Sequence, residues 1–182
     1  MKIVYLRDYP EYVDTVVDWI YNEFVIKEGK NKDKSKIKEY FSKTNYDNFP
    51  ICYIAVEGKL CLGTVSIFDN DLKPRQDLTP WLGALYVSEK HRGKGIAAKL
   101  INKVLERTGE MGYTKIYLRT EHTADYYKKR NWNFVSKEVD VDGRDTEVYV
   151  YNLKYKLFQQ ELKRMLLEFM KEHMKIVILL QN

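Results

Sequence analysis

The stretch from Leu85 to Leu100 constrains the fold of this chain more than any other part of its sequence. It begins as an apolar run of β-branched and aromatic residues, crosses a short polar link with two glycines, and continues with apolar residues at helical spacing. The helical positions are Ile96, Leu100, Ile101, Val104 and Leu105. The pattern predicts a strand, a tight loop and a helix in direct succession.

The loop between this strand and this helix has the features of an anion-binding turn. Gly93 and Gly95 carry no Cβ, so a bulky anion can come close to the backbone. The first amide N–H groups of a helix lack intrahelical partners, and the aligned peptide dipoles add positive charge, so a phosphate or pyrophosphate can bind there. Arg92 and Lys94 add full charges. An ordinary strand-to-helix turn, with glycines for close packing, is the alternative.

The residues Arg92, Gly95 and Ala97 resemble the acetyl-coenzyme A (acetyl-CoA) loop of the GNAT superfamily of N-acetyltransferases, whose pattern is Gln/Arg-x-x-Gly-x-Gly/Ala. The resemblance spans about residues 2–154. It implies that the strand before the loop splays from its parallel neighbour and that its free backbone groups bind the pantetheine arm. The coenzyme-binding residues that it implies are Leu85, Tyr86, Val87, Arg92, Gly93, Lys94, Gly95, Ile96, Ala97 and Tyr127.

A second stretch, 120–134, resembles the other signature of the superfamily, a short helix bearing a tyrosine that is followed four residues later by glycine and an aromatic residue. Tyr127, Asn131 and Trp132 occupy these places. Asn131 replaces the usual glycine, and asparagine also enters the left-handed conformation with little strain. The resemblance implies that Tyr127 donates a proton to the departing coenzyme thiolate. Tyr126 is a rival for this role, and a packing role is the other alternative.

The general base is not marked by a single motif. Strand 81–87 has Gly83 and Ala84, and no glutamate where some members of the superfamily carry one. Glu121 and His122 follow the next predicted strand, close to where the acetyl group would lie, and His122 titrates in the useful range. Either residue could take the proton directly or through water. Structural or solvent-exposed roles remain alternatives for both.

The rest of the chain predicts an α/β (α+β) fold with a mixed, mostly antiparallel sheet of about seven strands flanked by helices. Two hairpins are indicated by glycines between β-rich runs, at Gly58 and at Asp142-Gly143. An amphipathic helix is expected over Glu11–Phe24, with Asp8 as its cap. The helix after the glycine loop is expected to end at Gly109.

The last part of the chain, 155–182, predicts a helical extension to a catalytic domain that covers 1–154. Its apolar stripe is formed by Phe158, Leu162, Met165, Phe169, Ile176 and Leu179. Such a stripe is an aggregation risk in water, so the extension is expected to pack on its own domain or, alternatively, to form a homodimer.

Composition narrows the classes of function. A chain of 182 residues can bury one well-formed domain with a short appendage. The net charge of +5 is modest and the basic residues are scattered, so no nucleic-acid partner is expected. Cys52 and Cys61 are isolated, which indicates neither a disulfide framework nor a metal site. No signal peptide or apolar run of ~18 residues is present, so we expect a cytoplasmic protein without a membrane span.

These observations predict an enzyme that transfers acetyl from acetyl-CoA to a primary amine of a small molecule or peptide. The acidic loop 69–77 favours a cationic acceptor such as an aminoglycoside or a polyamine, although such a loop is also typical of a solvated surface. The alternative is a non-catalytic module that binds or senses acyl-CoA. A nucleotide-binding protein is disfavoured, because no Gly-x-x-x-x-Gly-Lys-Ser/Thr or Gly-x-Gly-x-x-Gly pattern is present.

Overall fold

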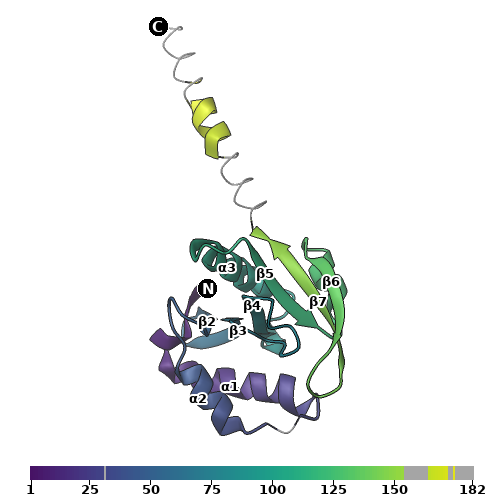
Figure 1. Cartoon of the computed structure of the whole chain (residues 1–182). Helices are drawn as coiled ribbons and strands as arrows, with labels where there is room; N and C mark the ends of the chain where they lie inside the picture. The colour runs from purple at the N-terminus through teal and green to yellow at the C-terminus, as the bar shows by residue number, and fades with distance from the viewer. Residues whose placement is uncertain (31, 154–163, 172–173, 175–182) are drawn as a thin grey trace.

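The computed structural model describes residues 1–30, 32–153, 164–171 and 174, and it contains one mixed sheet with helices on both faces (Figure 1). The strands are β1 (Lys2–Tyr5), β2 (Ile51–Glu57), β3 (Leu60–Phe68), β4 (Trp81–Val87), β5 (Lys115–Thr120), β6 (Asn133–Val139) and β7 (Asp145–Asn152). The main helices are α1 (Val13–Tyr21), α2 (Lys34–Ser42), α3 (Ile96–Glu110) and α4 (Ala124–Lys128). Short helical turns cover Leu6–Asp8, Pro10–Tyr12, Asn22–Ile26 and Glu89–His91, and residues 164–171 are also helical.

The strands lie in the order β1-β2-β3-β4-β5-β7-β6. All neighbours are antiparallel except β4 and β5, which are parallel and joined through α3 as a βαβ unit. The predicted fold, a mixed and mostly antiparallel sheet of seven strands with flanking helices, is therefore confirmed. Both predicted hairpins, β2–β3 and β6–β7, are confirmed as antiparallel pairs.

Strands β4 and β5 separate soon after they meet, because β4 contains a bulge. Their register contains a single pair, Trp81 with Tyr117. On the other side of β4, Thr64 pairs with Tyr86 and Ser66 pairs with Gly83, so two β4 residues oppose one β3 residue. An extra residue of this kind bends its strand and increases the local twist. The bulge therefore directs the second half of β4 away from β5.

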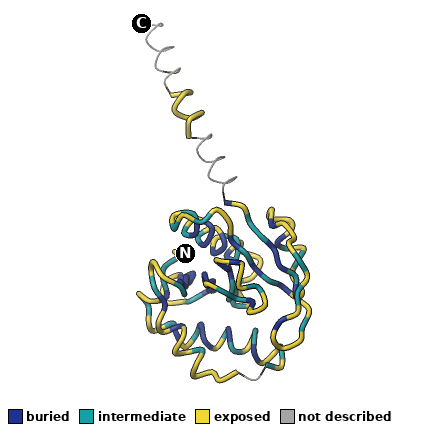
Figure 2. Tube along the Cα trace, in the orientation of Figure 1, coloured by how far each residue is buried: buried dark blue, intermediate teal, exposed yellow. Residues whose placement is uncertain are grey.

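The core forms two layers, one on each face of the sheet. Side chains alternate along a strand, so β2 buries Ile51, Tyr53 and Ala55 against the layer of α3, and Cys52 and Ile54 against the layer of α1 and α2. Burial on both faces explains why β2 is a continuous apolar run. Figure 2 shows the inward faces of α1 and α3 as buried and the outward faces as exposed.

Two helix ends differ from the sequence predictions. Helix α1 begins at Val13 and has no side-chain cap, because the Asp8 carboxylate accepts a hydrogen bond from the Tyr46 hydroxyl. Helix α3 continues through Gly109 to Glu110, and Gly112 takes the left-handed conformation with φ +85°. The predicted cap at Asp8 and the predicted end at Gly109 were both wrong.

Gly63 on β3 is required by close packing, and its replacement by alanine is expected to destabilise the fold. A Cβ at Gly63 would lie 2.6 Å from the Tyr86 carbonyl oxygen, a backbone atom that cannot rotate away. We expect Gly63→Ala to lower the free energy of unfolding by about 2 kcal/mol, as overpacking typically does. Denaturant unfolding measures this, with Leu60→Ala as the control, since Leu60 lies on the same strand and is 59% exposed. Equal stability of the two variants would contradict the packing argument.

Candidate active site

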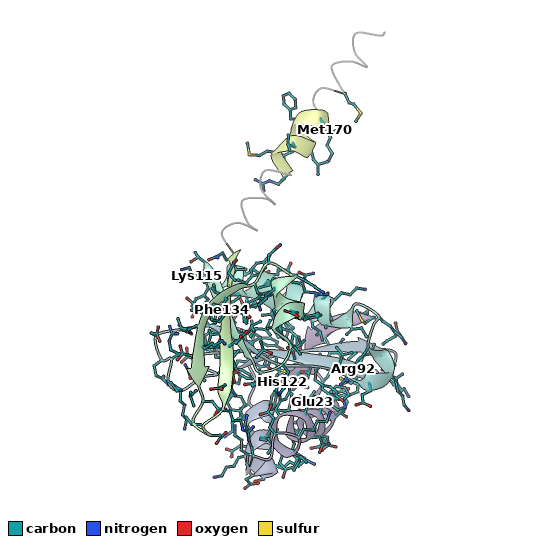
Figure 3. The ribbon with its side chains drawn as sticks, turned by 90° about the vertical axis from the view of Figure 1, so that its right-hand side faces the viewer. Glu23, Arg92, Lys115, His122, Phe134 and Met170 are labelled. Carbon is teal, nitrogen blue, oxygen red and sulfur yellow. The ribbon has the colours of Figure 1, made fainter. Side chains whose placement is uncertain are left out.

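A cleft with a volume of about 1590 Å³ runs along the separated half of β4. Its walls come from β4, the loop before α3, the end of β5, α4, and the segment from Ile20 to Phe41 that contains the end of α1 and most of α2. Figure 3 labels three lining residues from distant parts of the chain, Glu23, Arg92 and His122, which lie on one side of the body. The bulge in β4 thus leaves space between two strands that would otherwise pair.

The structure brings the residues of the glycine loop and β4 together on this cleft. Nine of the ten predicted coenzyme-binding residues line it; the exception is Lys94, whose side chain is exposed outside the lining. The lining residues are Leu85, Tyr86, Val87, Arg92, Gly93, Gly95, Ile96, Ala97 and Tyr127. Gly95 and Tyr127, 32 positions apart in the chain, therefore meet at one site.

The glycine loop leaves the start of α3 open to the cleft. Gly93 and Gly95 have φ angles of +75° and +74°, a conformation that other residues rarely adopt. A Cβ at either position would meet no protein atom within 4 Å, so the space above the backbone is free. Gly95 is the N-cap of α3 and supplies no side-chain cap. The first amides of α3 can therefore bind an anion, which fits the pyrophosphate of a coenzyme.

Arg92 is held beside this helix start by two contacts. Its Nε donates a hydrogen bond of 3.0 Å to the Val87 carbonyl, and its guanidinium lies 5.4 Å from the centre of the Tyr86 ring. Ser88 and His91 fix the same turn through a 2.6 Å contact between Oγ and Nδ1. The positive charge is thus placed at the cleft wall, next to the amides that can bind an anion.

Tyr127 lies on α4 and is only 8% exposed. Its ring packs edge-on against Tyr126 at 5.3 Å and against Trp132 at 5.9 Å. Among the described residues, none forms a hydrogen bond with the Tyr127 hydroxyl, although the residue lines the cleft. Burial, and secondly the neighbouring Tyr126, raise the pKa of the Tyr127 phenol, so it keeps its proton at neutral pH. Asn131 ends this helical segment with φ +64°, as predicted.

The two candidate bases predicted from sequence also line the cleft. Glu121 follows β5, and its Oε1 lies 3.7 Å from Arg119 Nη1. His122 is exposed at the cleft wall. Thr120 lies at the end of β5, and its hydroxyl is already engaged in local hydrogen bonds. It contacts the Thr123 hydroxyl at 2.8 Å and accepts a hydrogen bond from the Thr123 amide.

Only one carboxylate of the acidic loop 69–77 lines the cleft, and it is Asp71. Asp69 accepts a 3.0 Å hydrogen bond from Thr79, and Asp77 forms a two-pronged pair with Arg75 at 2.8 Å. In the sequence, the three carboxylates are equivalent. In the structure, the path of the loop places only Asp71 at the cleft.

The Acetyltransferase (GNAT) family model matches residues 13–132, which include α1, β4, the glycine loop, α3 and Tyr127. The chain belongs to this family. The predicted membership is thus confirmed, as is acetyl-CoA, the co-substrate that the family uses. No curated protein matches this chain in sequence.

Solved structures of similar fold include an aminoglycoside 6'-N-acetyltransferase complexed with coenzyme A, with a TM-score of 0.66 and 16% identity over 84% of this chain and 97% of that one. The aminoglycoside 6'-N-acetyltransferase from Enterococcus faecium has a TM-score of 0.64 and 15% identity, with coverages of 84% and 97%. A point mutant of the spermidine N-acetyltransferase SpeG from Vibrio cholerae has a TM-score of 0.65 and 17% identity, with coverages of 88% and 99%. These likenesses concern the fold.

Within the described ranges, no group of three or more His, Cys, Asp or Glu side chains is placed to hold a metal ion. In the same part of the chain, no helix combines the length and the apolar character needed to cross a membrane.

Proposed function

We propose that this protein transfers acetyl from acetyl-CoA to a primary amine of a small molecule or peptide by direct attack. The observation that carries this proposal is that one cleft is lined both by a largely buried tyrosine, whose hydroxyl has no hydrogen-bond partner in the described residues, and by an uncapped helix start. A coenzyme-binding module without catalysis needs the helix start but has no use for the tyrosine hydroxyl.

Each lining element has a role in this proposal. Acetyl-CoA supplies a thioester whose acetyl carbon is open to attack by an amine. The amides at Gly95 and the first turn of α3 bind the pyrophosphate, with Arg92 beside them. The backbone of Leu85–Val87, unpaired with β5, binds the pantetheine arm and polarises the carbonyl. Tyr127 donates a proton to the departing sulfur.

The acceptor amine must lose a proton before it attacks. Glu121 and His122 are the candidates predicted from sequence, and both line the cleft. We place the acceptor among small cationic amines, because Asp71 adds a carboxylate to the same cavity. Aminoglycoside and spermidine acetyltransferases among the similar folds act on such amines, which supports this choice. Free Cys52 and Cys61 suit a reducing compartment such as the cytoplasm.

Release of coenzyme thiol across a panel of amines tests the proposal. Spermidine, kanamycin and a short peptide with a free N-terminus represent the three acceptor types. Acetyl-CoA with at least one of them should release thiol faster than acetyl-CoA alone. Tight binding of acetyl-CoA without turnover of any amine would favour the non-catalytic module.

We also propose that the extension 155–182, beyond the catalytic domain 1–154, joins two copies of the chain. Met165, Leu166, Leu167 and Met170 are each more than half exposed, so the described part of the extension presents apolar surface. The other predicted stripe positions, apart from Phe169, lie outside the described residues. Light scattering is expected to give a dimer for the full chain and a monomer for a chain without 155–182. The same oligomeric state for both would make the extension irrelevant to assembly.

A further inference from the structure

Asp71 brings a carboxylate beside Gly83 of β4, a strand that carries no acidic residue of its own. It lies in the loop after β3, and that loop returns over Gly83: a Cβ on Gly83 would be 3.4 Å from Asp71 Oδ2. The same Cβ would lie 2.7 Å from the Phe68 ring. Because Gly83 has no side chain, the Phe68 ring and the Asp71 carboxylate can both approach β4. The carboxylate thus lies beside the residue that precedes the bulge at Ala84.

This position lies on the other face of the sheet from the helix start that is proposed to bind the coenzyme. Phe68 belongs to the core layer of α1 and α2, whereas the helix start at Gly95 belongs to α3 on the opposite face of the sheet. Ile37 and Tyr40 of α2 also line the cleft, and the centre of the Tyr40 ring lies 5.9 Å from that of the Phe68 ring. An amine that enters past α2 would meet Asp71 before it reaches the separated half of β4.

The charges around Asp71 leave a local excess of negative charge. Arg119 contacts three carboxylates: Asp140 at 3.3 Å, Asp71 at 3.5 Å and Glu121 at 3.7 Å. Asp140 is otherwise satisfied, since its Oδ1 accepts the amides of Asp142 and Arg144. Within the described part of the chain, the ion pairs of Asp71 and Glu121 are these long contacts with one shared guanidinium. A cationic ligand would offset the remaining negative charge of Asp71 and Glu121.

The surroundings also make Asp71 a stronger base than an ordinary aspartate. Burial raises the pKa of its carboxyl, Arg119 opposes this, and Glu121 adds to it, while Lys32 before α2 opposes it. Tyr40 faces the same carboxylate from α2, and burial together with Asp71 raises the pKa of Tyr40 to about 12. The Tyr40 phenol therefore keeps its proton at neutral pH, so Asp71 rather than Tyr40 is the proton acceptor of this pair.

Resting on the proposed function, we infer that Asp71 binds the ammonium group of the acceptor and accepts its proton. The proton moves from the ammonium nitrogen to an Asp71 oxygen, and the nitrogen lone pair then forms the C–N bond to the acetyl carbon. The C–S bond breaks, and the sulfur takes the Tyr127 proton. The nitrogen then gives up its second extra proton to solvent, which leaves the neutral amide. Solvent also removes the proton from Asp71 and returns one to Tyr127, so the net release is one proton and the protein ends unchanged.

The test compares Asp71→Asn with Asp77→Asn, since Asp77 lies in the same loop but outside the cleft. With the amines named above, Asp71→Asn is expected to lower kcat/KM by about 100-fold, the scale of a lost general base. The wild type should lose activity on acidification at a higher pH than an ordinary carboxyl would cause, and Asp71→Asn should lack this acidic limb. Asp77→Asn should stay within about threefold of the wild type. Asp71→Glu, which keeps a carboxylate, should keep the limb.

Binding measurements separate this inference from the proposed function. Asp71→Asn should bind acetyl-CoA as the wild type does and melt at a similar temperature; if it does not fold, Asp71→Ser replaces it. An active wild type with an Asp71→Asn variant of equal kcat/KM and equal acidic limb would overturn the role of Asp71 alone. A wild type that binds acetyl-CoA but acetylates no amine would overturn the proposed function. Calorimetric titration with spermidine would then test whether Asp71 contacts the ammonium group. Loss of spermidine binding in Asp71→Asn would support the contact, and unchanged spermidine binding would refute it.

Discussion

Replacing Gly95 with valine is expected to weaken acetyl-CoA binding by about 100-fold, which corresponds to about 2.7 kcal/mol. A Cβ on Gly95 would project into open space, and that space is where we propose that the pyrophosphate meets the first amides of α3. A β-branched side chain there would exclude the anion and would also strain a backbone with φ +74°. Calorimetric titration with acetyl-CoA measures the loss.

Gly143→Val provides the matched control for backbone strain. Gly143 has φ +77° in the β6–β7 turn, a Cβ there also meets nothing within 4 Å, and the residue does not line the cleft. Both variants should lose about 1–2 kcal/mol of stability from the left-handed conformation. Only Gly95→Val should lose affinity for the coenzyme. Equal affinities in the two variants would show that the glycine loop does not hold the pyrophosphate.

The glycine loop was predictable because its information is local. Left-handed glycines, a helix start and apolar periodicity all lie within one short stretch, and each has a direct physical meaning. The same is true of Asn131, whose side chain tolerates the φ of +64° that it adopts. The family resemblance added the meeting of this loop with Tyr127, which no local pattern supplies.

The bulge and the position of Asp71 were not predictable in this way. Ala84 adopts φ +51°, and alanine gives no sequence signal for such a conformation. Asp71 reaches β4 because the loop folds back over Gly83, a residue that lies 12 positions later in the chain. From the sequence alone, Asp69 and Asp77 were equally good candidates for a carboxylate that attracts a cationic acceptor.

The end of α3 was mistaken for a related reason. Gly109 and Gly112 can both end a helix, and the sequence does not distinguish them. In the structure, Thr108 is fully buried and its hydroxyl donates to the Val104 carbonyl, so packing against the sheet extends the helix past Gly109. Tertiary contact decided between two equivalent local signals.

Replacing Tyr127 with phenylalanine is expected to lower kcat by about 100-fold and to leave acetyl-CoA affinity unchanged. The ring contacts with Tyr126 and Trp132 survive in the variant, so the change removes only the hydroxyl. Because burial raises the pKa of Tyr127, ionisation of this phenol should not reduce wild-type turnover until the pH exceeds 10. Steady-state rates of thiol release over a pH series measure both effects.

Tyr126→Phe is the control for this prediction, since Tyr126 adjoins Tyr127 and lines the same cleft. The Arg130 guanidinium lies 3.7 Å from the centre of the Tyr126 ring, a contact that phenylalanine retains. We expect kcat within about threefold of the wild type, because the Tyr126 hydroxyl takes part in no step of the proposed reaction. If Tyr126→Phe is the slower variant, the proton comes from Tyr126. If both variants turn over at the wild-type rate, the sulfur is protonated by water, and burial of Tyr127 serves packing with Trp132.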